Sequence, residues 1–225
     1  MPAAPVITID GPGGSGKGTV SRLVAERLGW HFLESGALYR LVGLSAMKRH
    51  VALDDEPALS RISAQLNAEF DPRGGESAPI LLDGLNVVKD LRGELVGAAA
   101  SRVAVLPGVR RALLDRQRAF RRPPGLVADG RDMGTVIFPD AELKIFLDAS
   151  PFERAQRRYK QLKDKGMDVS LEALLRDIEE RDLRDRGREM APMRPAEDAI
   201  QIDTTSMTIA AVVDRILQLW QARCA

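Results

Sequence analysis

Nine residues near the N-terminus constrain the fold more than any other part of the chain: Gly11-Pro12-Gly13-Gly14-Ser15-Gly16-Lys17-Gly18-Thr19. The segment just before them, Val6 to Asp10, is a short apolar run rich in β-branched residues, as in a buried parallel strand. After them, apolar residues recur at helical spacing until Gly29: Val20, Leu23, Val24 and Leu28. Strand, glycine-rich loop and helix follow one another in the order that a phosphate-binding loop requires.

Each residue type in this loop has a physical purpose. Glycines let successive backbone N–H groups point into one concavity, and the N-terminus of the following helix adds partial positive charge. Lys17 can bring an ammonium group to the outer phosphates, and a hydroxyl at the end of the loop can reach Mg²⁺. Ser or Thr usually follows the lysine, but here Gly18 precedes Thr19, which resembles the loops of small nucleoside monophosphate kinases. The alternative is a glycine-rich turn before a helix that begins with lysine.

Length, charge and cysteine content exclude several classes of protein. The 225 residues suffice for one large or two small domains with a substantial core. The 33 basic and 32 acidic residues nearly cancel, so no overall field draws the chain to nucleic acid or to a membrane. The single cysteine, Cys224, indicates a reducing compartment, and His31 and His50 are too few and too far apart for a histidine metal site. Because neither a spanning apolar run nor a basic leader is visible, we expect a cytoplasmic protein.

Apolar runs that alternate with helical patterns predict a parallel sheet covered by helices. The candidate strands are Val6 to Ile9, His31 to Leu33, Leu126 to Ala128, Leu143 to Leu147 and Ala199 to Ile202. Three helix starts are marked by capping residues. Ser150 precedes a proline and a capping-box glutamate, Ser170 precedes an apolar stripe, and Thr208 precedes the closing helix.

Residues 67 to 90 interrupt this alternation. The run Asp71-Pro72-Arg73-Gly74-Gly75 predicts a loop, and Ile80 to Leu82 and Val87-Val88 flank a turn as in a β-hairpin. Because the segment lies between the second and third predicted core strands, we expect it to project as a small lobe. The residues leave open whether this lobe binds a ligand or only decorates the fold.

Polar residues follow two of the predicted strands, at the sheet edge where ligands of open α/β folds gather. They are Glu34-Ser35-Gly36-Ala37-Leu38-Tyr39-Arg40 and Asp129-Gly130-Arg131-Asp132-Met133-Gly134. Asp129 ends an apolar strand, a position that suits a carboxylate organising Mg²⁺ and its waters. The alternative for Asp129 is a loop or capping aspartate.

Arginines concentrate in two later segments. The run from Glu180 to Arg188 alternates in sign at the end of a helical pattern, and Arg154, Arg157 and Arg158 follow the fourth predicted strand. Runs of this kind are commonly solvated helix faces held by ion pairs. Beside a phosphate-binding loop they can instead supply the cations that phosphoryl transfer needs. The residues alone leave both interpretations open.

Four stretches together resemble bacterial cytidylate kinase: Gly11 to Thr19, Ser35 to Arg40, Ala128 to Val136 and Glu180 to Arg186. The resemblance covers essentially the whole chain, including the insert that distinguishes this family from other monophosphate kinases. The stretch Gly130-Arg131-Asp132-Met133-Gly134-Thr135 is more selective than the phosphate-binding loop. The resemblance implies a P-loop NTPase three-layer α/β fold with a parallel five-stranded sheet. Its core would comprise residues 1–35, 100–153 and 189–225, with an NMP-binding insert at about 36–99 and a lid at about 154–188.

On the donor side, the resemblance implies that Gly11 to Thr19 holds the phosphates of ATP and that Arg154, Arg157 and Arg158 close over it. Lys17, Arg131 and Arg181 would be catalytic. Mg²⁺ would accompany ATP, held by Thr19 and Asp129 mostly through water.

On the acceptor side, the resemblance implies three groups of residues. Ser35, Arg40 and Arg131 would grip the monophosphate, Ser101, Arg110 and Asp132 would read the base, and Arg181, Asp185 and Arg188 would engage sugar and phosphate. A carboxylate can accept from the exocyclic amine of cytosine, whereas uracil presents an acceptor there and should be repelled by Asp132. Glu34 stands where the family would be expected to have aspartate, which leaves the charge but alters its position.

These features predict an enzyme of pyrimidine nucleotide metabolism that transfers the γ-phosphoryl group of ATP to CMP or dCMP. Its partners would be these small-molecule substrates, without nucleic acid or membrane, and the chain would be a monomer. One rival is a kinase for AMP, UMP or shikimate, which the pairing of Asp132 with Arg110 disfavours. A second rival is a nucleotide-dependent switch, which should lack a second, arginine-rich anion pocket. A structural or nucleic-acid-binding role is weaker, given the net charge of +1.

Overall fold

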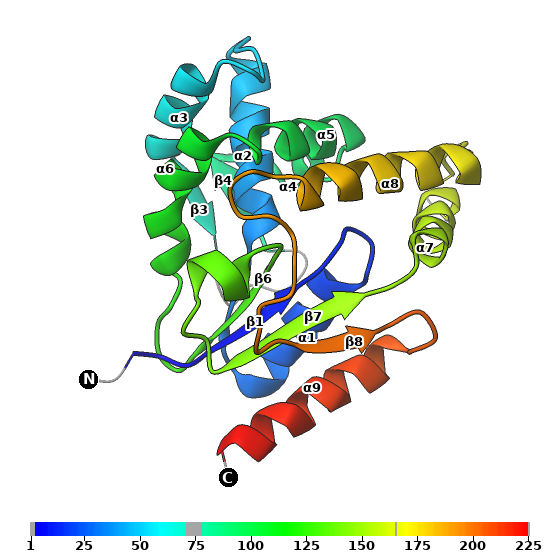
Figure 1. Ribbon diagram of the computed structural model, residues 1–225. Helices are drawn as coiled ribbons and strands as arrows, with labels where there is room; N and C mark the ends of the chain where they lie inside the picture. Colours follow the sequence, from blue (N-terminus) through cyan, green and yellow to red (C-terminus); the bar gives the residue numbers. More distant parts are fainter. Residues whose placement is uncertain (1–2, 71–77, 165, 225) are drawn as a thin grey trace.

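A five-stranded parallel sheet forms the centre of the computed structural model, which describes residues 3–70, 78–164 and 166–224 (Figure 1). The strand order is β2-β6-β1-β7-β8. The strands are β1 (Val6–Asp10), β2 (His31–Glu34), β6 (Leu126–Gly130), β7 (Leu143–Asp148) and β8 (Ile200–Asp203). All five predicted core strands are therefore confirmed, with ends that differ by one or two residues.

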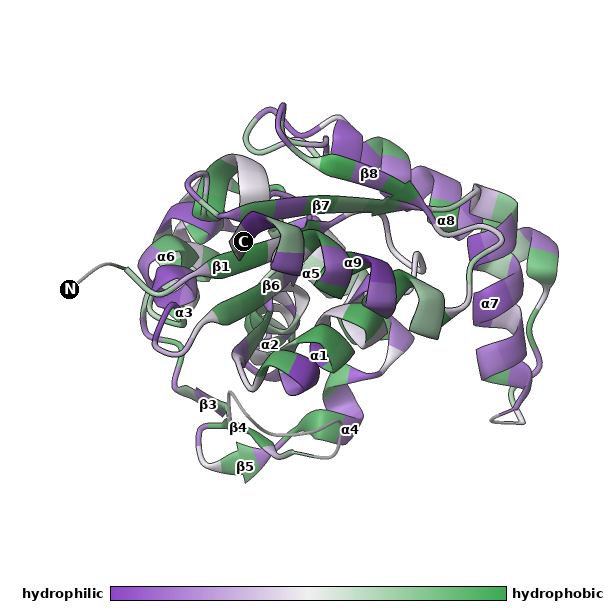
Figure 2. Ribbon diagram, turned by 90° about the horizontal axis from the view of Figure 1, so that it is seen from below, coloured by the Kyte–Doolittle hydropathy of each residue, from purple (hydrophilic) through white to green (hydrophobic). Residues whose placement is uncertain are grey.

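The central strands are buried on both faces, and their residues alternate between two hydrophobic clusters. Ile7 and Val127 pack with α1 (Lys17–Leu28) and α9 (Ile209–Cys224), which lie side by side on one face (Figure 2). Val6 and Leu126 pack on the other face, which is covered by α2 (Ser35–Lys48) and by η1 (Met133–Ile137), a π-helical turn. The result is the expected three-layer arrangement of helices, sheet and helices.

The segment between β2 and β6 forms a mostly helical lobe beside the sheet (Figure 1). Its helices are α3 (Glu56–Ala64), α4 (Val88–Leu91), α5 (Glu94–Val103) and α6 (Pro107–Arg118), together with α2. A small antiparallel sheet joins β3 (Ala68–Phe70), β4 (Ile80–Leu82) and β5 (Leu85–Asn86). The predicted hairpin is confirmed in part: Val88 begins α4, so Leu85–Asn86 and not Val87-Val88 form the second strand. The predicted loop Asp71 to Gly75 lies outside the described residues, as does the side chain of Cys224.

A helical hairpin of α7 (Pro151–Lys163) and α8 (Leu171–Arg186) projects from the carboxyl end of β7 (Figure 1). The predicted caps are present. The hydroxyl groups of Ser150, Ser170 and Thr208 accept from the backbone N–H groups three residues later at 3.2, 3.4 and 3.2 Å. The reciprocal half of the expected capping box is replaced, because the N–H of Ser150 donates to Thr205 at 3.2 Å. None of the described helices is long and apolar enough to cross a membrane.

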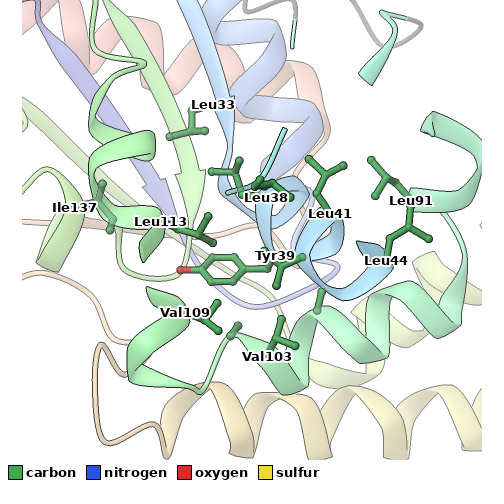
Figure 3. Packing of buried hydrophobic residues seen from close by; sticks show 14 of the residues in the cluster. Leu33, Leu38, Tyr39, Leu41, Leu44, Leu91, Val103, Val109, Leu113 and Ile137 are labelled. Atoms are coloured by element: carbon green, nitrogen blue, oxygen red, sulfur yellow. The ribbon is translucent and has the colours of Figure 1, made fainter. Parts of the chain in front are cut away.

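Leu113→Ala is expected to reduce the free energy of unfolding by about 2–5 kcal/mol, because it leaves a cavity in a packed core. Leu113 on α6 is fully buried near Tyr39 and Ile137 (Figure 3). Leu183→Ala is a matched control, because Leu183 is 71% exposed and its loss should change the free energy by about 0.5 kcal/mol or less. Urea unfolding of both variants measures the difference, and equal effects would contradict this assignment of the core.

Candidate functional site

The glycine-rich loop is held by side chains that bind its carbonyl groups. Lys17 Nζ donates to the carbonyl of Pro12 at 2.9 Å, Arg154 Nη1 to that of Gly13 at 3.0 Å, and Thr204 Oγ1 to that of Ser15 at 3.2 Å. Gly16 precedes α1 in the left-handed region, with φ of 86°. With three carbonyl groups bound in this way and α1 beginning at Lys17, the loop has the geometry of an anion-binding helix N-terminus.

The departure at position 18 has a steric explanation. A Cβ on Gly18 would lie 3.2 Å from Asp129 Oδ2, so Ser or Thr at this position would crowd the carboxylate that ends β6. Glycine thus allows the buried Asp129 to approach the start of α1. The hydroxyl side chain comes one residue later, on the exposed Thr19.

A cleft of about 1420 Å³ joins the loop to the lobe and to the helical hairpin. Residues 13–20 line it together with Arg40 and Ser101 from the lobe and Arg157, Arg158 and Arg181 from the hairpin. The cleft is therefore large enough for more than one small ligand.

Two arginines from different elements converge on the loop. A Cβ built on Gly13 would lie 3.5 Å from Nη2 of Arg131 and 3.6 Å from Nη1 of Arg181. Burial, and then the charge of Arg131, lowers the pKa of Arg181 to about 10 and also lowers the pKa of Lys17. These three cations repel one another, so a phosphate anion between them would be strongly stabilised.

Asp185 on α8 ties the arginines to the hairpin. Its carboxylate accepts from Arg131 Nε at 2.9 Å and also pairs with Arg188. Burial opposes its ionisation, but Arg131 and Arg188 hold the pKa of Asp185 below its ordinary value. The sequence-predicted residues Arg131, Asp185 and Arg188 thus form one connected group.

A second group lies deeper in the lobe. Arg110 pairs with Asp132, and both side chains are about 5% exposed or less. The guanidinium of Arg110 lies 5.6 Å from the ring centroid of Tyr39 and donates to the carbonyl of Ala104 at 3.1 Å. The buried hydroxyl of Ser101 has no hydrogen-bond partner among the described residues. A buried polar atom of this kind is available to a ligand.

Ser35 and Arg40 stand at the start of α2, beside the end of β6. A Cβ on Gly130 would lie 2.7 Å from the hydroxyl of Ser35, and Arg40 Nη1 donates to the carbonyl of Leu91 at 2.6 Å. Burial lowers the pKa of Arg40, and the charge of the exposed Glu34 opposes this effect. Glu34 therefore lies near enough to influence the predicted acceptor side, although its effect on positioning stays a prediction.

The three arginines predicted to close over ATP have different environments. Arg154 is 1% exposed and bound to Asp182 at 2.5 Å, in addition to its bond to the loop. Arg157 donates to the carbonyl of Thr204 at 2.7 Å, and Arg158 pairs with Glu94 at the start of α5. Arg154 is therefore committed to protein groups, whereas Arg158 is at the rim of the cleft, where it joins the hairpin to the lobe.

Asp129 and Thr19 fit the oxygen chemistry that Mg²⁺ prefers. Burial raises the pKa of Asp129, and the nearby Lys17 opposes this effect. Among the residues that the structure describes, no group of three or more His, Cys, Asp or Glu side chains could hold a metal ion by itself. A metal here would rely on nucleotide phosphates and water for its remaining ligands.

Three residues that the sequence analysis did not select support the site. Asp182 binds Arg154, Thr204 binds the loop, and Asp10 accepts from two backbone N–H groups beside Asp132. Asp10 and Thr204 each stand at the carboxyl end of a core strand, so the positional rule that selected Asp129 could have found them. Asp182 carries no comparable signal, because its partner is 28 residues away.

Comparison with known proteins gives one consistent family. The family model described as cytidylate kinase matches residues 7–222. A cytidylate kinase of Aeromonas salmonicida (strain A449) is 58% identical over 214 residues, 95% of this chain and 93% of that protein. Those of Stutzerimonas stutzeri (strain A1501) and Pseudomonas aeruginosa (strain UCBPP-PA14) are 59% and 57% identical, over 95% and 96% of this chain and 93% and 95% of those proteins. With its loop, its converging arginines and this similarity over nearly its full length, the chain belongs to the cytidylate kinase family.

Proposed function

We propose that this protein transfers the γ-phosphoryl group of ATP to CMP and dCMP, giving ADP and the corresponding diphosphates. Family membership supports the reaction. The observation that carries the assignment of residues is the convergence of Arg131 and Arg181 on Gly13 of the loop. Cations at this point lie between a donor phosphate on the loop and an acceptor phosphate near Arg131, where the group in transfer would pass.

On the donor side, the loop Gly11 to Thr19 holds the phosphates of ATP, and Lys17 exchanges its bond to Pro12 for the phosphate oxygens. The short bond to a backbone carbonyl supports this role, because it keeps the ammonium group at the phosphate side of the loop. Arg157 and Arg158 close over the nucleotide. Arg154 acts from beneath, by fixing the loop.

On the acceptor side, Ser35, Arg40 and Arg131 grip the monophosphate, with Arg181, Asp185 and Arg188 at sugar and phosphate. Ser101, Arg110 and Asp132 read the base. Arg110 occupies one side of the Asp132 carboxylate, which leaves the remaining acceptor capacity for the exocyclic amine of cytosine. The unpartnered hydroxyl of Ser101 supports its role as a further base contact.

Magnesium accompanies ATP and is held by Thr19 and Asp129, mostly through water, where it would neutralise phosphate charge and fix phosphate geometry. The acceptor phosphate is already an anion, so the protein needs no dedicated base. Its residues act by placing the two phosphates in line, by excluding water and by stabilising charge with Lys17, Arg131 and Arg181.

The division into a core, an insert at about 36–99 and a lid at about 154–188 is also our proposal, with the lid closing when both nucleotides are bound. Three of these bounds fall inside α2, α5 and α7, so the moving parts would include or exclude whole helices. Both proposed pockets are built from one chain, which supports a monomer. The single cysteine is consistent with a cytoplasmic enzyme.

Lys17→Ala is expected to lower kcat by about a hundredfold or more, because it removes a cation that binds the oxygens in transfer. Single-turnover measurement of ADP formation with CMP separates this step from binding. Leu183→Ala, far from the loop in sequence and exposed on α8, serves as a control of unchanged activity. Near-normal turnover of the Lys17 variant would contradict the proposed role.

Asp132→Asn is expected to reduce the preference for CMP over UMP by about tenfold or more, because an amide can donate to the uracil oxygen that a carboxylate repels. Asparagine also keeps an acceptor for Arg110, so the buried guanidinium retains a partner. The kcat/KM values for CMP and UMP, compared at saturating ATP, measure the change. An unaltered ratio would show that another residue reads the base.

Arg154→Leu is expected to reduce the free energy of unfolding by about 3–5 kcal/mol, because it leaves Asp182 buried without its partner. Arg158→Ala should change stability by about 0.5 kcal/mol or less and should instead raise KM for ATP. Urea unfolding and initial-rate kinetics distinguish the two arginines. A stable Arg154 variant with selectively weakened ATP binding would restore Arg154 to the nucleotide-contacting group.

A further inference from the structure

The carboxylate of Asp10 holds a backbone turn that is remote in sequence. Oδ1 accepts from the N–H of Met133 at 2.9 Å, and Oδ2 accepts from the N–H of Gly134 at 2.8 Å. Both bonds are buried, and Asp10 itself is 5% exposed. Each carboxylate oxygen thus has its own donor, an arrangement that an isosteric amide could not reproduce, because its nitrogen would face an N–H group.

The two bound amides come directly after the residues proposed for the acceptor. Arg131 and Asp132 form the link between β6 and η1, and Met133 and Gly134 begin η1. Asp10 lies beside Gly130 in the sheet, so the link is anchored on one side by strand pairing and on the other by this carboxylate. The positions of Arg131 and Asp132 are therefore fixed at both ends of a short segment.

Close packing prevents the turn from shifting toward the sheet. A Cβ on Gly134 would lie 2.8 Å from the hydroxyl of Thr8 and 3.2 Å from Cδ of Lys144. The backbone at Gly134 therefore lies directly against β1, and only glycine allows the approach that brings its N–H to Asp10. The same strand end continues into Gly11 of the phosphate-binding loop, so Asp10 joins the two nucleotide sites mechanically.

We propose that Asp10 is a positioning residue for the acceptor nucleotide, acting through the amides of Met133 and Gly134 on Arg131 and Asp132. The proposal rests on the acceptor roles proposed above for these two residues. Asp10 does not touch the nucleotide. It sets the angle and depth at which Arg131 meets the phosphate and Asp132 meets the base.

Asp10→Asn tests this role, because it keeps the shape of the side chain and loses one of the two hydrogen bonds. We expect KM for CMP to rise about tenfold, the preference for CMP over UMP to fall, and KM for ATP to stay within about twofold. Gly134→Ala is a second variant that acts on the same contact from the turn and should give the same acceptor-selective loss. Asp203→Asn is the matched control: Asp203 also ends a core strand and accepts from one amide, that of Thr205 at 2.8 Å, and its KM for CMP should not change.

A double variant shows whether the effect passes through Asp132. If Asp10 acts through Asp132, then Asp10→Asn in an Asp132→Asn background should cause a much smaller further loss of base preference. Equal losses for ATP and CMP, an unchanged KM for CMP, or failure of both the Asp10 and Gly134 variants to fold would overturn the proposal. Failure of the proposed function is separable, because it would appear in the wild-type protein or in Asp132→Asn alone.

Discussion

Repulsion among the cations around Gly13 is the constraint on which the site depends. Lys17, Arg131 and Arg181 come from α1, the β6–η1 link and α8, and all are largely removed from solvent, where like charges repel strongly. The fold offsets this repulsion with buried carboxylates. Asp185 pairs with Arg131, and Asp129 faces the start of α1. Since each carboxylate belongs to a different element from the cation beside it, the sheet, the loop and the helical hairpin must meet here for the charges to balance.

Features encoded in short stretches of sequence could be predicted. The five core strands are runs of apolar residues between turn signals, and the helix starts at Ser150, Ser170 and Thr208 carry capping residues whose partners are only three residues away. The phosphate-binding loop was also visible, because its glycines and Lys17 act within one turn of chain. The acceptor residues were a different case: they were assigned from the resemblance to a family, and the structure brings Arg131, Asp185 and Arg188 into contact.

Features that depend on distant partners were missed or misplaced. Val87-Val88 has strand propensity, but pairing with β4 ends at Asn86 and leaves Val88 to begin a helix, an outcome set by tertiary contacts. Arg154 has the spacing of a lid arginine, yet Asp182 on the neighbouring helix and the carbonyl of Gly13 bind it in the interior. Asp10 reads in the sequence as the last residue of a strand. Its two donors are more than a hundred residues away, and no local pattern indicates them.

The two ends of the acceptor site differ in charge, and this difference orients the ligand. Around Gly13 the cations outnumber the carboxylates in direct contact with them, whereas Arg110 and Asp132 form a closed pair deeper in the lobe. A nucleoside monophosphate is itself asymmetric, with its charge at one end and hydrogen-bonding groups at the other. Entering in reverse, it would bring its phosphate to the carboxylate of Asp132 and leave the cations without an anion. The field therefore selects the orientation before any base contact forms, and the base contacts then need only to distinguish one nucleobase from another.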